Sequence, residues 1–240
     1  MLPAMAAKIS ASPAPRRGRP PAQPGDAMRP DARHRLLLAG FAEFARNGYD
    51  KASTRAIAGR AGANIALISY HFTDKAGLYR AVLNTTCAPM SAGFARLTDP
   101  KLDLAAGLRL CYAGFLDALR DPDEAAAHAI RIHFRECMDP SDVFRDWIAG
   151  AIQPMFDALM QVLQRHLRLA RPDDDLRRLG FAIVALANDY WMSGPFIDVL
   201  APKLRQKSNW VDATIERLTD YGCAMVVAER ARRRKRARAR

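Results

Sequence analysis

The residues whose types and spacing suit a recognisable chemistry lie between positions 53 and 72. Ser53 and Asn64 are good N-cap residues, and each stands before a short stretch with apolar residues at helical spacing. The residues left to face outward from the second stretch are Asn64, Ala66, Leu67 and Ser69. Small side chains let a helix approach base edges closely, Asn can pair with adenine, and an apolar side chain can meet a thymine methyl group. The stretch therefore predicts recognition of double-stranded DNA by a helix in the major groove.

Two short helices joined by a glycine turn would position these side chains. The inward residues of the first helix are predicted to be Ile57, Ala58 and Ala61. Gly62 stands where a tight turn requires a positive φ, and Ile65 and Ile68 are predicted to anchor one face of the second helix. This layout is that of a helix-turn-helix. The alternative is that the two segments are only capped, packed helices.

Helical signals continue on both sides of this pair. A helix is predicted over about 31–47, with Asp31 as N-cap and Gly48 as stop, and a helix capped by Thr73 or Asp74 should follow. That following helix is predicted to turn Leu78 and Val82 inward. Proline boundaries then predict helices at 103–119, 123–136, 141–169, 173–192 and 208–232, the third of which is kinked or divided by Pro154. No β alternation is found, so the predicted fold is all-α.

The basic residues are unevenly distributed along the chain. The formal net charge of +12 divides into +4 over residues 1–30, +4 over 31–83, −3 over 84–227 and +7 over 228–240. Basic excess on one short domain and at both ends is typical of a protein that binds a polyanion. Nucleic acid is the first interpretation, and an anionic membrane surface is the second.

The remaining His, Cys and acidic residues do not form a pattern typical of catalysis or metal binding. The four cysteines are far apart, which favours reduced thiols in the cytoplasm. His128 and His133 are about 140° apart on a helix, and the run Asp173-Asp174-Asp175 has no calcium-loop spacing and indicates the acidic start of a helix. Signatures of hydrolases and nucleotide-binding enzymes are absent too. We therefore expect no enzyme activity, no metal and no cofactor. No stretch of the sequence reaches the about 18 uninterrupted apolar residues that a membrane-spanning helix needs.

Four stretches of residues 31–83 carry a further pattern, namely Phe44 to Tyr49, Ser53 to Gly62, Tyr70 to Phe72 and Lys75 to Leu78. They closely resemble the TetR family of bacterial repressors. The family pattern runs from F-x-x-x-G-Y through T/S-x-x-x-I-A-x-x-A-G to Y-x-x-F or Y-H-F and then K-x-x-L. The resemblance implies an N-terminal three-helix helix-turn-helix DNA-binding domain and a C-terminal helical ligand-binding and dimerisation domain.

The same resemblance assigns roles to single residues. Ser53, Thr54 and Arg55 would touch phosphates or groove edges, and residues 64–70 would supply recognition. Tyr70, His71 and Lys75 are similar to the phosphate clamp of the family. Many members have Tyr where this chain has Ser69, so how Ser69 and Tyr70 divide their roles stays open, and packing is an alternative for Tyr70 and His71.

The C-terminal part is predicted to pair two subunits and to bind an effector. A dimer is expected because two heads held about 34–36 Å apart are needed for useful affinity. In the TetR family the last two long helices form a four-helix interface, for which the candidates here are Leu179, Ile183, Leu186, Tyr190, Val211, Ile215 and Leu218. The same residues could also form the core of one subunit, and the two interpretations do not exclude each other. The candidates for the effector pocket, polar residues among apolar neighbours, are Tyr112, His133, Arg135, Glu136, Asn188 and Trp191. The segment 131–140 and the region of Asn188 are also similar to the CerR-type subgroup of TetR regulators.

The sequence thus predicts four parts: a disordered basic arm at 1–29, a DNA-binding domain at 30–83, an effector-binding and dimerisation domain at 84–229 and a basic tail at 230–240. Arg16-Arg17-Gly18-Arg19-Pro20 in the arm is similar to an AT-hook core, and a solubilising tail is the alternative. The C-terminal tail is interpreted as a solvated helix end, with a non-specific contact to DNA or lipid as the alternative. The predicted function is a cytoplasmic repressor that binds a palindromic operator as a homodimer and is released by a small-molecule effector. An all-α enzyme with a DNA-binding head and an architectural or membrane-surface protein are the other hypotheses.

Overall fold

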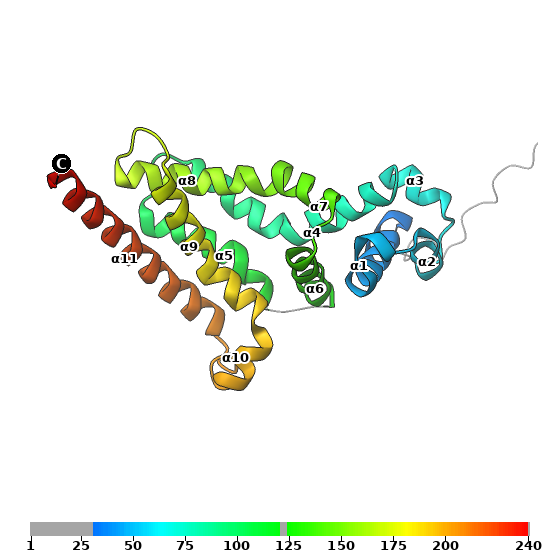
Figure 1. Ribbon diagram of the computed structural model, residues 1–240. Coiled ribbons are helices and arrows are strands. Elements are labelled where there is room, and N and C mark those ends of the chain that lie inside the picture. Colours follow the sequence, from blue (N-terminus) through cyan, green and yellow to red (C-terminus); the bar gives the residue numbers. More distant parts are fainter. Residues whose placement is uncertain (1–30, 121–123, 240) are drawn as a thin grey trace, which may run out of the picture. The chain divides into compact units, whose positions relative to one another are not determined.

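The computed structural model describes residues 31–120 and 124–239, and every regular element within them is helical (Figure 1). The predicted all-α fold is therefore confirmed. The arm predicted at 1–29, including the Arg-Gly-Arg-Pro segment, lies outside the described residues. Within the described ranges no helix is both long and apolar enough to cross a membrane.

The first four helices form one packed unit around a common apolar core. They are α1 (Ala32–Lys51), α2 (Thr54–Arg60), α3 (Ala66–Phe72) and α4 (Lys75–Ala95). Two of the predicted caps are present, because the Ser53 side chain accepts a hydrogen bond from the backbone N–H of Ala56 and the Asp74 side chain accepts one from Gly77. The predicted inward residues of α2 and α4 are all buried, namely Ile57, Ala58, Ala61, Leu78 and Val82. Helical periodicity therefore located these two elements correctly.

Of two local predictions in this region, one is confirmed and one was wrong. Gly48 interrupts the helical geometry of α1 with a φ of 73°, as its predicted role as a stop requires, and helical residues continue beyond this kink to Lys51. Ile65 is 48% exposed and does not anchor α3. It belongs to the turn before α3, whereas the buried face of α3 consists of Ile68 and Phe72, which are spaced by one helical turn.

The rest of the chain folds into further helices that surround a second apolar core. They are α5 (Leu104–Leu116), α6 (Glu124–Met138), α7 (Asp142–Trp147), α8 (Gln153–Leu167), α9 (Asp174–Met192), α10 (Gly194–Leu200) and α11 (Trp210–Arg238), with short 3-10 turns at Arg96–Thr98 and Asp117–Leu119. The predicted helix at 141–169 is divided by a π-helical turn, Ile148–Ile152, directly before Pro154. The division is expected, because Pro cannot donate a backbone hydrogen bond to the preceding turn. The helix α10 was not predicted.

The helix α4 contributes to both cores, and α6 and α7 contribute to the first. Ile132 of α6 and Phe144 and Trp147 of α7 are buried in the core of α1–α4. The second core is built mainly by α5, α8, α9 and α11, with α5 packed against both α4 and α11. The helices α6 and α7 are therefore in direct contact with the predicted DNA-binding part.

Two buried tyrosines differ in what their hydroxyl groups contact, and this difference predicts different effects of removing them. The Tyr79 hydroxyl donates to Oε1 of Glu136 at 2.5 Å, whereas the buried Tyr112 hydroxyl has no partner among the described residues. Tyr79→Phe should lower the free energy of unfolding by about 1–3 kcal/mol, because a buried carboxylate loses one of its donors. Tyr112→Phe should leave it unchanged or raise it slightly. Urea unfolding of both variants tests this, and equal losses would contradict it.

Candidate nucleic-acid interface and adjoining cavity

Polar contacts from α1 fix the position of α2 and of the turn that follows it. Glu43 is buried, and its Oε1 accepts hydrogen bonds from the backbone N–H of Ser53 at 3.2 Å and from Nδ2 of Asn47 at 2.8 Å. At the other end of α2, Nε of Arg35 donates to the carbonyl oxygen of Ala61 at 3.0 Å. Sequence reasoning missed Glu43, although an acidic residue inside the apolar run 41–45 was the available signal. These contacts attach α2 at both ends to α1.

The turn between α2 and α3 has the geometry that its glycine predicts. Gly62 has a φ of 57°, a backbone conformation that favours glycine. The backbone N–H of Ala63 returns to the carbonyl oxygen of Ala58. Oδ1 of Asn64 accepts from the backbone N–H of Ala66 at 2.9 Å, so Asn64 caps the start of α3 even though the regular helix begins two residues later. The turn therefore fixes the direction in which α3 leaves α2.

The outer face of α3 carries small and polar side chains and one large aromatic ring. Asn64, Ala66 and Ser69 are exposed as predicted, and the Tyr70 side chain is 80% exposed. Leu67 was predicted to face outward, but it is half-buried because it packs against the core of α1–α4. The ring of His71 is half-buried and lies edge-on to Tyr70 with 4.9 Å between ring centroids. Most of the predicted recognition residues thus lie on one accessible surface.

The residues that flank α3 differ in how free they are to contact a phosphate. At the start of α2, Ser53 and Arg55 are exposed and Thr54 is half-buried. Nζ of Lys75 donates to the carbonyl oxygen of Asp50 at 3.0 Å and lies 4.7 Å from the ring centroid of Tyr49. Lys75 therefore also stabilises the contact between α1 and α4, and two of its three donors remain for other partners.

A separate cavity of about 320 Å³ lies between α4, α5, α6, α7 and α9. Three of the predicted effector residues, His133, Asn188 and Trp191, line it together. Tyr112, Arg135 and Glu136 do not line it. Tyr112 is buried against Gly222 of α11, Arg135 reaches toward α1, and Glu136 accepts a hydrogen bond from Tyr79 of α4. The other lining residues are largely apolar, with Thr86, Cys87 and Cys137 as the further polar groups. The cavity is suited to a small, mainly apolar molecule.

His133 is surrounded by rings inside this cavity. Its imidazole lies edge-on to Trp191 at 5.2 Å and to Phe144 at 6.1 Å between centroids. Burial lowers the pKa of His133 below its usual value, since desolvation disfavours the charged form, and the nearby Glu136 opposes this only partly. His133 is therefore neutral at physiological pH and offers one donor or one acceptor to a ligand.

The helix α6 joins this cavity to the helices of the predicted DNA-binding part. Glu136 is buried, and its carboxyl group accepts from the hydroxyl of Tyr79 on α4 and from the backbone N–H and hydroxyl of Ser141. Next to it, Nη2 of Arg135 donates to the carbonyl oxygen of Arg46 at 3.1 Å, and its side chain covers Gly48 so closely that a Cβ there would be 2.8 Å from Cδ of Arg135. One helix therefore contacts the cavity, α1 and α4.

The predicted dimerisation residues are mostly interior to the subunit. Five are buried in the core of one chain, namely Leu179, Ile183, Val211, Ile215 and Leu218, while Leu186 and Tyr190 are partly buried against that core. The alternative stated for them, packing within one subunit, is what the structure describes. The large apolar side chains that are exposed on the same two helices are Phe181, Tyr221 and Val227. An interface on these helices would use those residues instead.

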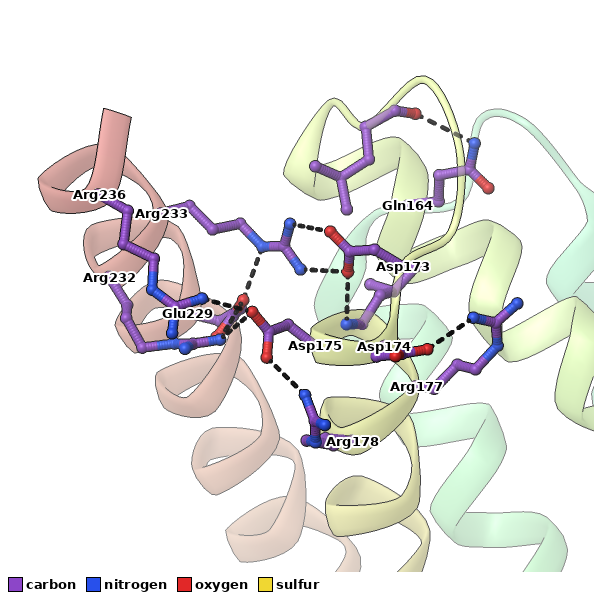
Figure 2. A network of polar contacts seen from close by, with 12 residues as sticks. Gln164, Asp173, Asp174, Asp175, Arg177, Arg178, Glu229, Arg232, Arg233 and Arg236 are labelled. Carbon is purple, nitrogen blue, oxygen red and sulfur yellow. Dashed lines mark hydrogen bonds and ion pairs between the residues drawn. The ribbon is translucent and has the colours of Figure 1, made fainter. Parts of the chain in front are cut away.

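Part of the basic tail is engaged in ion pairs with the start of α9 (Figure 2). Arg233 forms two hydrogen bonds to Asp173, at 2.6 and 2.7 Å, and Arg232 and Arg236 both contact Asp175. The Arg233 guanidinium holds the pKa of Asp173 well below its usual range. Asp173 is also the N-cap of α9, which agrees with the acidic helix start predicted there. The tail is therefore a continuation of α11, and these three of its arginines are paired.

Two regions of the chain match known protein families. Residues 36–82 match the bacterial regulatory proteins of the tetR family. Residues 105–224 match the C-terminal domain of the HTH-type transcriptional dual regulator CecR, and this range includes both stretches on which the subgroup resemblance rested. The first match covers α2 and α3 entirely, and the second covers most of the helices around the cavity.

Individual relatives agree with these matches. The HTH-type transcriptional regulator BetI of Klebsiella pneumoniae (strain 342) is 26% identical over 181 residues, which cover 69% of this chain and 83% of the relative. A TetR-like transcriptional regulator from Rhodococcus sp. RHA1 has a similar fold, with a TM-score of 0.56, 17% identity, and coverage of 80% of this chain and 96% of its own. A putative transcriptional regulator from Pseudomonas aeruginosa PAO1 gives a TM-score of 0.55 at 21% identity, covering 78% and 90%.

Proposed function

The chain belongs to the TetR family of bacterial transcriptional regulators, and on that premise we propose that it is a ligand-responsive repressor. It binds a palindromic operator in the cytoplasm as a homodimer, and a small molecule releases it. The observation that carries the proposal is the exposed face of α3, where Asn64, Ser69 and Tyr70 are accessible on a helix that α1 and the Gly62 turn hold in place. In this arrangement residues 64–70 supply recognition, and Ser53, Thr54 and Arg55 contact phosphates or groove edges. Tyr70, His71 and Lys75 form the phosphate clamp.

The two predicted domains have different roles in this proposal: residues 30–83 bind DNA, and residues 84–229 bind the effector and the second subunit. Because α4 runs without a break from Lys75 to Ala95, it crosses the boundary and connects the two activities. Two subunits pair through the exposed faces of α9 and α11, which carry Phe181, Tyr221 and Val227. Pairing is required because one helix-turn-helix makes few base contacts.

The effector occupies the cavity between α4 and α9 and acts through α6. A ligand there contacts the side of α6 that carries Ala129, Ile132 and His133, while Arg135 and Glu136 of the same helix hold α1 and α4. A shift of α6 on binding would therefore change the position of α4 and with it the spacing of the two reading helices. The ligand is expected to be uncharged and largely apolar, because the cavity presents a neutral His133 and Asn188 as its main polar groups.

Selection of bound sequences from a random duplex pool, followed by release with small molecules, tests the proposal. We expect an inverted repeat whose half-sites are about one DNA turn, ~34–36 Å, apart. Two of the three tryptophans, Trp147 and Trp191, line the cavity, so ligands that release DNA should also change the intrinsic fluorescence. Enrichment of no sequence, or of single half-sites alone, would contradict the proposal.

A cavity-filling variant links release to the cavity. Ala118 is half-buried at its lining, so Ala118→Phe should reduce ligand-induced release about tenfold or more while operator affinity stays within about twofold. Titration of the released fraction against ligand concentration measures this effect. Ala170→Phe, the same change at an exposed position outside the cavity, is the control and should respond like the unchanged protein. Equal ligand response in both variants would place the effector elsewhere.

The two other hypotheses make different predictions in the same experiments. An enzyme with a DNA-binding head would convert a small molecule in the absence of DNA. An architectural or membrane-surface protein would bind random duplexes or anionic vesicles as well as any operator, and removing residues 1–29 and 230–240 would abolish that binding. A repressor without those segments still selects the inverted repeat.

A further inference from the structure

The end of α8, the C-terminal part of α11 and the segment before α5 line an open groove of about 820 Å³. Its single carboxylate belongs to Asp103, which is already engaged in capping α5 through the backbone N–H of Ala106 at 2.7 Å. The basic residues that line it are Lys101, Arg165, Arg168, Arg230, Arg233 and Arg234. Such an excess of one sign of charge in a concave site attracts a ligand of the opposite sign.

The arginines in the C-terminal part of α11 differ in whether a carboxylate neutralises them, and Figure 2 shows the neutralised ones. Arg232, Arg233 and Arg236 form ion pairs with acidic residues at the start of α9 and with Glu229. Arg230 and Arg234, one helical turn apart, line the groove beside Arg233, and within the described part of the chain neither of the two is paired with a carboxylate. The groove therefore keeps the charge of Arg230 and Arg234 although acidic residues neutralise the neighbouring arginines.

The groove face of α8 also contains donors without a matching acceptor. Nε of Arg165 is buried and has no hydrogen-bond partner among the described residues, while its Nη2 donates to the carbonyl oxygen of Leu102 at 3.3 Å. A buried donor on a charged group that lacks an acceptor costs free energy. Arg168, which ends α8 with a φ of 56°, is exposed and is not paired with a carboxylate in the described residues. The buried Nε of Arg165 therefore lacks an acceptor within the described chain, and the exposed guanidinium of Arg168 is available to an anion in the same groove.

The dipoles of the helices that end at the groove do not balance all of its positive charge. The C-terminal end of α8 carries the equivalent of about half a negative charge, which favours nearby cations such as Arg165 and Arg168. Arg230 uses one donor in this way, since its Nη2 donates to the carbonyl oxygen of His166 at 2.5 Å. Five basic side chains without a carboxylate partner exceed what one or two helix ends balance. The surplus favours a bound anion of more than one charge.

We propose that this groove binds a small molecule that carries at least two linked phosphate groups. Arginine forms paired hydrogen bonds with phosphate oxygens, and guanidinium groups from α8 and α11 reach the same space from two sides. The size of the groove exceeds that of a single phosphate, and its cations come from three separate segments. This site is independent of the operator and of the effector cavity.

Isothermal titration of the full-length protein with inorganic tripolyphosphate at fixed ionic strength tests the proposal. We expect saturable binding with one site per subunit, and sulfate added at equal ionic strength should not reproduce it. The double variant Arg168→Ala with Arg234→Ala should weaken this binding about tenfold or more, because each removed arginine takes charge-assisted hydrogen bonds with it. Arg238→Ala, the same change on α11 outside the groove, should stay within about twofold.

Thermal unfolding of each variant separates lost binding from lost folding, and Lys101→Ala provides a second groove variant that leaves both helices intact. Equal effects of Arg238→Ala and the groove variants would overturn the proposal, because the response would then reflect net charge alone. Titrations with a mixed-sequence duplex and with vesicles containing anionic lipid complete the test. The proposal would also be overturned if the unchanged protein did not bind tripolyphosphate and the groove variants instead weakened binding to the duplex or to the vesicles.

Discussion

Tyr70→Ala should weaken operator binding by about 100-fold while leaving the thermal stability unchanged. The side chain is 80% exposed on α3, so its removal costs little in the folded protein. In a dimer the contact is lost from both subunits, and a contact worth about 1–3 kcal/mol per subunit gives a total loss of about 2–6 kcal/mol. A 100-fold weakening, about 2.7 kcal/mol, lies toward the lower end of this range. Fluorescence anisotropy with the selected inverted repeat at constant salt measures the effect.

The pattern of the loss also tells which part of the DNA Tyr70 contacts. If the hydroxyl contacts a phosphate, Tyr70→Phe should weaken binding to selected and random duplexes alike; if the ring contacts a base, Tyr70→Phe should bind almost normally and Tyr70→Ala should relax the sequence preference. Phe134→Ala removes another exposed ring, on α6, and should not change operator affinity. Unchanged affinity of Tyr70→Ala would contradict the proposed role of α3.

The sequence predicted the DNA-binding part well because its signals are local. A Ser or Asp cap, a glycine with positive φ and apolar residues one turn apart each act within a few residues, and the predicted features at Ser53, Gly62, Asp74 and Leu78 are all present. The exchange of roles between Ile65 and Leu67 arises because α3 has only two turns. On so short a helix the position of the first regular residue decides which apolar side chain is buried, and Asn64 allows a start at either Ile65 or Ala66.

Features that depend on tertiary contacts could not be predicted from the sequence. An apolar stripe has the same spacing whether it packs inside a subunit or between two, so Leu179, Ile183 and Ile215 could not be assigned to one or the other. The same holds for Tyr112 and Arg135, since a polar residue among apolar neighbours faces a cavity only if the adjacent helix leaves space there. The ion pairs of Arg233 with Asp173 join residues 60 positions apart, and only the fold brings them together.

A row of exposed apolar residues on α11 is the second surface at which a single substitution should have a large effect. Tyr221, Ala224, Val227, Ala228 and Ala231 are all exposed and recur every three or four residues, which places them on one side of the helix. Their mostly small side chains allow the backbones of two helices to approach closely, and Phe181 of α9 adds a 65% exposed ring. This stripe replaces the buried residues Val211, Ile215 and Leu218 as the predicted contact between subunits.

Val227→Glu should therefore convert the dimer into a folded monomer. Val227 is 61% exposed in the subunit, so a carboxylate there is solvated in the monomer but would be buried opposite its own copy in a symmetric dimer. Losing the second head should reduce operator affinity by about 10²- to 10⁴-fold, because the two half-sites are then bound independently. Size-exclusion chromatography with light scattering and anisotropy with full and half operators measure both effects. Phe134→Glu, at a position 58% exposed on α6, should remain a dimer. A dimeric Val227→Glu protein with normal operator affinity would place the subunit contact on another surface.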